Sequence, residues 1–211
     1  MINRADLKKQ FQNRRSLFAG WTSIAHPQVT EMLVRSGIDW LGVDIEHSTI
    51  TQEQSQRIIA ACHANEVFCL PRVASHNPEA IKRLLDSGAD GVIIPTVETV
   101  EQVEKIIEWT KYPPIGKRGF GVARAQGYGY DFEKYTTEWN KSSVLVIQIE
   151  SVFAVEHLEE LLEFEEVDGV MVGPYDLSGS LGVPGQITHD LVNDSIAHVI
   201  ETCKRYGKSC G

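Results

Sequence analysis

The stretch VLVIQIESVFAVEHLEELLEFEEVDGVMVGPYDLS, residues 144–178, carries the pattern that decides the fold. It contains two short apolar runs rich in β-branched residues, 144–149 and 169–172, and residues 153–164 between them have the spacing of an amphipathic helix. Strands that are apolar at nearly every position are typical of a parallel sheet covered by helices. The stretch therefore predicts a strand, a helix and a second strand parallel to the first.

The same alternation runs through the rest of the chain. Further strand-like runs lie at 17–21, 40–45, 67–73 and 91–95. Further helix-like segments lie at 27–36, 52–65, 78–87, 100–112 and 189–206. Six strand–helix units in series predict a barrel or an open doubly wound sheet. Because GWTSIAHP, and not a dinucleotide-binding glycine motif, follows the first strand, we expect an α/β fold of the TIM (β/α)₈ barrel class.

Two parts of the chain fit this pattern less well. The final KSCG resembles the start of a seventh strand, and a closed barrel needs that strand, an eighth and their helices. We therefore expect a single barrel domain over residues 1–211 that lacks roughly the last two βα units. The glycine- and aromatic-rich stretch 112–143 predicts a long, partly ordered excursion that contains Lys117 and Arg118. We expect it to build subunit contacts, with a reach into a neighbour's site as the alternative.

The composition restricts the classes of partner. The 211 residues carry a net charge of -9, which gives no general attraction to nucleic acid or anionic membranes. The N-terminal residues are too polar for a signal peptide, and no apolar run approaches the roughly 20 residues of a membrane span. The four cysteines form no CxxC pair and predict reduced thiols. We expect a cytoplasmic enzyme with small-molecule substrates.

Polar residues directly follow five consecutive predicted strands, which is where barrel enzymes place their active sites. The candidates, in chain order, are Asp44, Glu46, His47, Arg72, Thr96, Gln148, Glu150, Tyr175 and Asp176. Scattered surface charge would not be confined to one end of the strands. The set therefore predicts one catalytic or binding site.

Glu150 and Asp176 are the candidate metal ligands. They follow neighbouring parallel strands, whose axes lie about 4.8 Å apart. Two carboxylates and water suit a hard divalent cation, Mg²⁺ or Mn²⁺, with Co²⁺ as a third candidate. Such a site accepts a 2-oxo acid and offsets the charge of its enolate. The alternative is that each carboxylate caps the following helix.

Arg72 and His47 are the candidate catalytic residues beside this pair. Arg72 offers a forked donor to the enolate oxygen, with an ion pair to a strand-end acid as the alternative. An imidazole exchanges protons near neutral pH, so His47 is the candidate proton shuttle. Asp86 ends a predicted helix and could orient His47, across a subunit boundary; a solvated helix end is the alternative.

Three further residues are candidates for substrate binding. Gly173 precedes a predicted helix start, so the backbone N–H groups of Tyr175 and Asp176 could hold a substrate carboxylate. The alternative is an ordinary tight turn. Gln148 lies two residues before Glu150 and is either a ligand contact or a core amide.

Together these residues resemble the HpcH/HpaI aldolase family, the metal-dependent class II pyruvate aldolases that include 4-hydroxy-2-oxoheptanedioate aldolase. The matching stretches, in chain order, are DWLGVDIEH (39–47), LPRV (70–73), LLDSGADGVIIPTVET (84–99), YPPIGKRGFG (112–121), VIQIES (146–151) and DGVMVGPYDLSGSLG (168–182). They extend over nearly the whole chain, and their combination in this order is specific.

The resemblance implies roles and an activity. Glu150 and Asp176 match the metal ligands, Arg72 matches the arginine that binds the pyruvyl oxygen, and His47 and Asp86 match the base and its paired acid. Members cleave 4-hydroxy-2-oxo acids to pyruvate and an aldehyde, catalyse the reverse addition, and are commonly hexamers. Tyr175 stands where members more often have a small or amide residue, which predicts a narrower pocket beside the metal.

Three other functions remain open from the sequence. A lyase of CoA thioesters, like the citrate lyase β subunit, would need a basic cluster, and only Lys117, Arg118 and Arg124 cluster in this acidic chain. A Schiff-base aldolase would need a lysine at a strand end. A non-catalytic barrel that binds a keto acid would need no proton shuttle.

Overall fold

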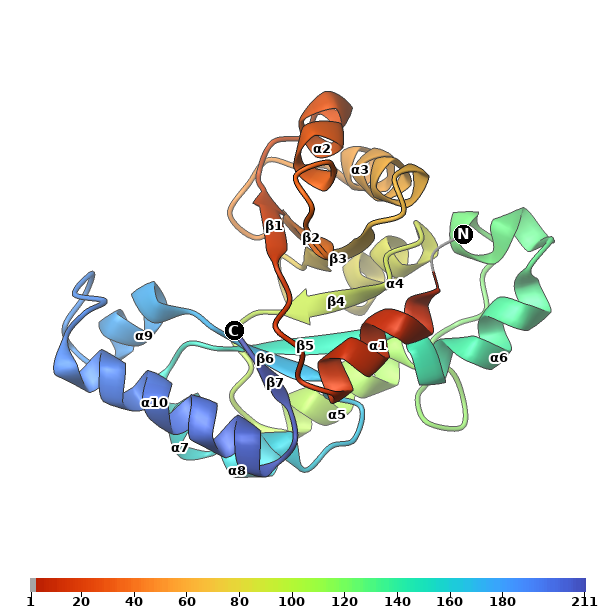
Figure 1. Cartoon of the computed structure of the whole chain (residues 1–211). Helices are drawn as coiled ribbons and strands as arrows, with labels where there is room; N and C mark the ends of the chain where they lie inside the picture. The colour runs from red at the N-terminus through yellow and green to blue at the C-terminus, as the bar shows by residue number, and fades with distance from the viewer. Residues whose placement is uncertain (1–2) are drawn as a thin grey trace.

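The computed structural model describes residues 3–211, and within them seven parallel strands form one sheet in the order of the sequence (Figure 1). The strands are β1 (Ala19–Thr22), β2 (Trp40–Asp44), β3 (Phe68–Arg72), β4 (Gly91–Ile94), β5 (Val144–Ile149), β6 (Gly169–Val172) and β7 (Ser209–Cys210). The order of a doubly wound sheet would reverse at a switch point, so the predicted succession of βα units is confirmed. No pairing joins β1 to β7 in this described part, and the sheet is a curved half-barrel. That two βα units are lacking stays a prediction.

Helices alternate with the strands, largely as predicted. They are α2 (Pro27–Val34), α3 (Gln52–Ala64), α4 (Pro78–Asp86), α5 (Val100–Thr110), α7 (Val152–Glu156), α8 (Leu158–Leu162), α9 (Pro174–Ser180) and α10 (Asp190–Arg205). The helix predicted at 153–164 is wrong as a single element, because it breaks at His157 into α7 and α8. His157 leaves helical geometry there, which allows Leu158 to be fully buried.

Alternation along each strand separates two apolar layers. On β5, Leu145, Ile147 and Ile149 pack outward against the helices, whereas Val144 and Val146 belong to a second cluster inside the half-barrel. Successive side chains of a strand point to opposite faces, so Gln148 and Glu150 continue the inner row. The strand pattern thus delivers polar groups to the mouth of the half-barrel.

The N-terminal residues form a helix that the sequence analysis did not anticipate, α1 (Arg4–Gln12). Its Leu7 and Phe11, one helical turn apart, are buried in the inner cluster with Leu70 and Ile93. Figure 1 shows α1 beside the strands near the start of β5. The helix closes the inner core at the N-terminal ends of the strands.

The expectation of a partly ordered excursion at 112–143 is also wrong. It contains a 3-10 turn, η1 (Arg124–Gly129), and the helix α6 (Phe132–Ser142), which packs against α1. Arg118 is 2% exposed, and its guanidinium lies 4.5 Å from the ring centroid of Trp139. It is therefore an internal cation of its own chain and not a surface contact as predicted.

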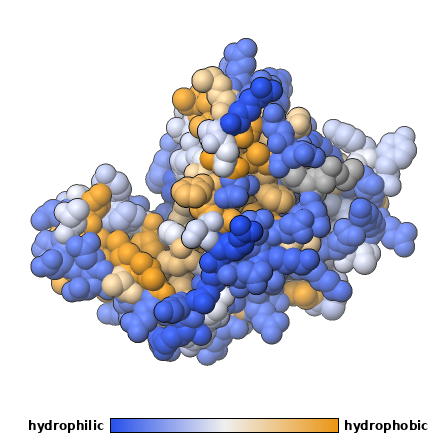
Figure 2. All heavy atoms as spheres, viewed as in Figure 1, coloured by the Kyte–Doolittle hydropathy of each residue, from blue (hydrophilic) through white to orange (hydrophobic). Residues whose placement is uncertain are grey.

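The surface visible in Figure 2 is largely hydrophilic. Figure 2 shows hydrophilic side chains over most of the visible face, while apolar ones gather alongside α10. Within residues 3–211, none of the helices combines the length and the apolarity that a membrane crossing requires.

Candidate active site

The polar residues predicted from strand ends meet at one edge of the sheet. Asp44 and Arg72 end β2 and β3 and are partners in the strand register. Gln148 on β5 pairs in register with Met171 on β6, two residues before Gly173. Because neighbouring strands end side by side, these positions form what we call the polar rim, defined by Asp44, Glu46, His47, Arg72, Gln148, Glu150 and Asp176.

Arg72 lies at the centre of the polar rim. Its Nη2 donates to Asp44 Oδ2 at 2.8 Å, and its Nε lies 3.2 Å from Glu46 Oε2. A third donor, Nη1, reaches Gln148 Oε1 at 3.3 Å. The ion pair left open by the sequence is therefore present. It also holds the guanidinium toward β5, where Glu150 follows.

A tryptophan that the sequence analysis missed supports the guanidinium. The carbon Cζ of Arg72 lies 5.1 Å from the ring centroid of Trp21 on β1. A Cβ on Gly42, the register partner of Trp21, would come within 2.3 Å of that ring. A glycine inside a buried strand was the available signal, because it marks a close approach.

Glu150 is a buried carboxylate of the rim that accepts two hydrogen bonds. It is 6% exposed; its Oε1 accepts the N–H of Thr96 at 2.7 Å, and Oε2 accepts from Gln148. Thr96 holds that N–H in place with a φ of 51°, an uncommon conformation for a β-branched residue. A Cβ on Gly173 would lie 2.6 Å from Glu150 Oε2, so glycine is required there. The two hydrogen bonds fix Glu150 without supplying any positive charge.

The electrostatics tie Glu150 to its neighbours. Burial raises the pKa of Glu150, and the charges of Glu46 and Asp176 raise it further against the two hydrogen bonds. Burial likewise raises the pKa of Glu46, with Asp44 and Asp176 adding to it against the pull of Arg72 and His47. The charges of these carboxylates therefore interact with one another.

Asp176 and Tyr175 lie in the first turn of α9, directly after Gly173. Asp176 is exposed, and Tyr175 is 67% exposed, so its side chain is not packed into the rim. The backbone placement agrees with the predicted helix start. The narrowing of a pocket by Tyr175 stays a prediction.

The charge balance of the rim fits a divalent cation. Arg72 pairs with Asp44 and Glu46, whereas among the described residues Glu150 and Asp176 have no ion pair with a lysine or arginine, and the buried Glu46 Oε2 has no hydrogen bond. Among residues 3–211, no three acidic, histidine or cysteine side chains are grouped closely enough to hold a metal by themselves. Two carboxylates with water or substrate oxygens are the donor set that Mg²⁺ and Mn²⁺ use.

His47 and Asp86 are not brought together within the chain. The His47 side chain is 65% exposed, with Nε2 3.7 Å from Glu46 Oε2. Asp86 ends α4, which returns to the opposite end of the sheet, where its Oδ1 accepts from Arg118 Nη2 at 2.8 Å. Their pairing across a subunit boundary stays a prediction.

Comparison with known proteins places the chain among aldolases. The sequence model described as HpcH/HpaI aldolase/citrate lyase matches residues 17–210. A hydroxypyruvate/pyruvate aldolase of Roseobacter denitrificans is 34% identical over 206 residues, covering 97% of this chain and 80% of that protein. A 2-keto-3-deoxy-L-rhamnonate aldolase of Escherichia coli is 39% identical over 195 residues, covering 90% and 72%.

The solved structures agree. A family protein from Burkholderia cenocepacia, described as an HpcH/HpaI aldolase/citrate lyase, superposes with a TM-score of 0.94 at 29% identity. The match covers 98% of this chain and 83% of that one. The half-barrel is thus the shared architecture, and the polar rim lies within the matched range.

Proposed function

The chain belongs to the HpcH/HpaI aldolase/citrate lyase family and is an aldolase, and we propose that it cleaves 4-hydroxy-2-oxo acids into pyruvate and an aldehyde and catalyses the reverse addition. The observation that carries this proposal is the unbalanced negative charge around Glu150 and Asp176 beside Arg72. Retro-aldol cleavage leaves an enolate, whose charge needs compensation in the site.

Glu150 and Asp176 would hold the divalent cation in this proposal. The buried position of Glu150 and the raised pKa that its carboxylate neighbours help to produce support this role. When bound, Mg²⁺ or Mn²⁺ would supply Lewis-acid stabilisation of the pyruvate enolate. Gln148 and Thr96 then serve to aim the Glu150 carboxylate through their N–H groups.

Arg72 and His47 would act on the substrate directly. The guanidinium of Arg72, held by Asp44 and resting on Trp21, offers N–H donors to the developing oxyanion. Cleavage also requires a proton to leave the 4-hydroxyl group. His47 is exposed at the rim beside Glu46, so its imidazole can accept that proton and return it in the addition direction.

A pyruvate-release assay tests the proposal. The chain is given several 4-hydroxy-2-oxo acids, including 2-keto-3-deoxy-L-rhamnonate, with EDTA and then with Mg²⁺ or Mn²⁺ added back. We expect release of pyruvate without any thioester, loss of turnover with EDTA, and recovery with metal. Undiminished turnover in EDTA would contradict the metal role.

The same assay separates the other candidate functions. Cleavage only of CoA thioesters would indicate a citrate lyase-like enzyme, and pyruvate binding without turnover would indicate a keto-acid sensor. Borohydride treatment with pyruvate should give no adduct, because within residues 3–211 none of the lysines directly follows a strand. The buried Lys111 donates to Ser143 Oγ at 2.7 Å, just before β5 begins, at the end of the sheet opposite the polar rim.

A further inference from the structure

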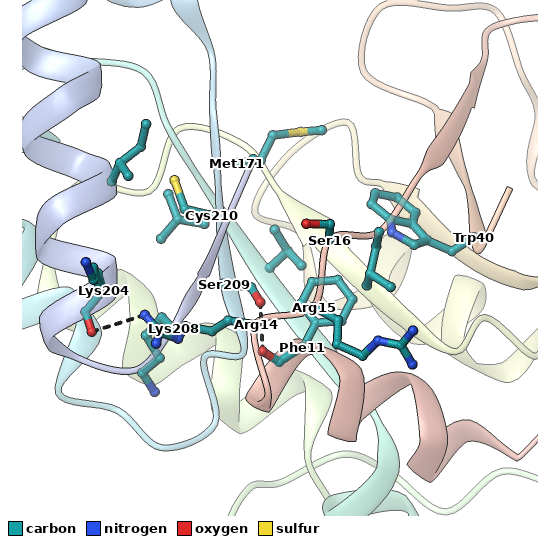
Figure 3. A pocket seen from close by; sticks show the side chains of 15 residues that line it. Phe11, Arg14, Arg15, Ser16, Trp40, Met171, Lys204, Lys208, Ser209 and Cys210 are labelled. Atoms are coloured by element: carbon teal, nitrogen blue, oxygen red, sulfur yellow. Dashed lines mark hydrogen bonds between the residues drawn. The ribbon is translucent and has the colours of Figure 1, made fainter.

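The carboxylate of Glu150 is held by residues at the strand ends and not by the apolar interior. Figure 3 shows a cavity beside that interior, between α10 and the segment that follows α1, with Phe11 and Trp40 in its wall. Among the described residues that line this cavity, none belongs to the polar rim. The hydrogen bonds that fix Glu150 come from Thr96 and Gln148, at the level where the strands end.

The turn that directly follows β4 provides one of these bonds. Its Thr96 N–H donates to Glu150 Oε1 at 2.7 Å. The next N–H along the chain, that of Val97, donates to Gln148 O at 3.4 Å. Thr96 has a φ of 51°, and a β-branched residue keeps that conformation only where its surroundings hold it. Both bonds join the turn to β5, so a contact on its other side is needed to keep the Thr96 N–H aimed at Glu150.

His76, from the loop between β3 and α4, makes that contact. Its Nε2 lies 2.7 Å from Pro95 O. A carbonyl oxygen only accepts, so Nε2 carries the proton and donates it. The carbonyl of Pro95 and the N–H of Thr96 belong to one trans peptide group and point in opposite directions. This peptide is therefore held between the imidazole of His76 on one side and the carboxylate of Glu150 on the other.

The loop keeps His76 in place because it is tied to the start of α4. His76 is half-buried and directly precedes Asn77, the N-cap of that helix. The side chain of Asn77 accepts the N–H groups of Glu79 and Ala80 at 2.9 and 3.0 Å. Its own N–H donates to Ser75 O at 2.8 Å. The backbone that carries the imidazole is thus anchored to a helix end.

The arrangement strengthens the hold on Glu150 without adding charge beside it. Hydrogen bonds in a chain polarise one another, so donation to Pro95 O makes the Thr96 N–H a better donor. A neutral imidazole and a peptide group leave the negative charge of Glu150 uncompensated. Groups that orient a metal ligand in this way typically change metal affinity by about 10–100-fold.

We propose that His76 is a positioning residue, which aims the Glu150 carboxylate through the peptide group that joins Pro95 to Thr96. The proposal rests on the proposed function, in which Glu150 holds the divalent cation. His76 does not contact Glu150 itself, so its effect is transmitted by the two hydrogen bonds of one peptide.

The first test needs neither metal nor substrate. Amide hydrogen exchange is measured by NMR on the parent chain, His76→Leu and His76→Gln. Leucine donates no hydrogen bond, so exchange at Thr96 and Val97 should become about tenfold or more faster. Glutamine can place an amide donor near the position of Nε2 and should keep most of the protection. Unchanged exchange at Thr96 in His76→Leu would overturn the proposal, as would an equal loss in both variants.

Two controls keep this result interpretable. Thermal unfolding and the amides of Val92 and Ile93, inside β4, show whether each variant is folded. The shorter His76→Asn is polar but does not reach Pro95 O, so it should lose protection as His76→Leu does. A folded His76→Asn chain with full protection of the turn would contradict the role of the donated hydrogen bond.

The second test measures the dissociation constant of Mn²⁺ by electron paramagnetic resonance, without turnover. His76→Leu should bind Mn²⁺ about 10–100-fold more weakly than the parent, and His76→Gln should restore most of the affinity. The matched control is His157→Leu, because His157 Nδ1 also lies 2.9 Å from a backbone carbonyl, that of Phe153, and should leave binding unchanged. Parent-like binding in His76→Leu would overturn the proposal. A parent chain that binds no Mn²⁺ would instead contradict the proposed function, and amide exchange at Thr96 would still decide the role of His76.

Discussion

The two ends of the same parallel strands differ in whether their carboxylates are paired with cations. At the N-terminal ends each buried carboxylate has its own cation: Asp168 lies 2.6 Å from Lys8, and Asp90 lies 2.9 Å from Arg4. At the C-terminal ends Asp44 and Glu46 share Arg72, and among the described residues Glu150 and Asp176 have no ion pair and Glu46 Oε2 has no hydrogen bond. One sheet thus has a neutralised end and an end left negative.

The pKa directions express the same contrast. Burial opposes ionisation of Asp90, but the hydrogen bond from His63 and the charge of Arg4 outweigh it and lower the pKa. At the polar rim, burial and neighbouring carboxylates raise the pKa of Glu150. A negative charge without a partner costs stability, so its retention at the polar rim indicates a ligand that binds there. The N-terminal ends of the strands, which we call the paired end, contribute to stability alone.

Substitution of Glu150 should give the largest effect. Glu150→Gln keeps the shape and can still accept the Thr96 N–H, but it removes one carboxylate from the proposed cation site. We expect kcat to fall on the order of 10³-fold or more, since such a cation is worth several kcal/mol. The melting temperature should stay equal or rise, because an unpaired buried charge is removed. Kinetics and calorimetry on the same sample check both, with the exposed Glu53→Gln as control.

Substitution of a carboxylate at the N-terminal ends of the strands should lower stability and leave activity unchanged. Asp168→Asn leaves Lys8, which is 7% exposed, without its counter-charge. We expect unfolding to become easier by about 3–5 kcal/mol, which lowers the melting temperature by roughly 6–20 °C for a chain of this size. Activity per folded molecule should not change. Adding Lys8→Met to Asp168→Asn should restore part of the loss, and a large fall in kcat from Asp168→Asn alone would break the division between the two ends.

Arg72 also tests whether the C-terminal strand ends serve activity, since it both pairs with acids and, in the proposed function, faces the substrate. Arg72→Ala should remove about 3–4 kcal/mol of transition-state stabilisation and so lower kcat roughly 10²–10³-fold. Arg72→Lys keeps the positive charge but loses the forked pair of N–H donors, so its kcat should lie between those of the wild type and Arg72→Ala. Metal binding by calorimetry should persist in both variants. Wild-type turnover in Arg72→Ala would show that the guanidinium only neutralises Asp44.

The polar rim was predictable because strand parity and strand ends are local features. The inner row of β5 and the polar residue after it can be read from the alternation around Gln148, and Arg72 follows from the end of β3. Trp21 was not predicted, and Thr96 was predicted only as a strand-end candidate without its role, since both roles depend on contacts with Arg72 and Glu150 from other strands. Such contacts are set by the tertiary fold and leave little trace in local spacing.

The paired end was the part that sequence reasoning misjudged. The helix α1 has only Leu7 and Phe11 as its apolar anchors, too few to distinguish it from a polar tail. Residues 112–143 order around Arg118, whose guanidinium packs on the rings of Tyr112 and Trp139. A cation buried among aromatic rings has no periodic signature, so glycine and aromatic content suggested disorder instead.

The smallest expected effect concerns Lys111, the exception at the paired end. It is 1% exposed and donates to Ser143 O and Oγ, but it has no carboxylate within ion-pair distance in the described part of the chain. Burial, and then the charge of Lys8, lower its pKa to about 7. Lys111→Met should therefore stabilise the fold, by on the order of 2–3 kcal/mol after the loss of two hydrogen bonds.

The pH dependence distinguishes this cause from better packing. The pKa of Lys111 is about 7 in the folded chain and near its ordinary 10.5 in the unfolded one. Between these values the unfolded chain binds the proton and the folded chain does not, so stability falls as the pH decreases from 10.5 to 7 and then levels off. The advantage of Lys111→Met should be greatest at and below pH 7 and shrink toward pH 9.5. Urea denaturation at several pH values measures it, with the exposed Lys117→Met as control. An advantage that does not change with pH would mean that Lys111 is neutralised by a partner, and the contrast between the two ends would then have no exception.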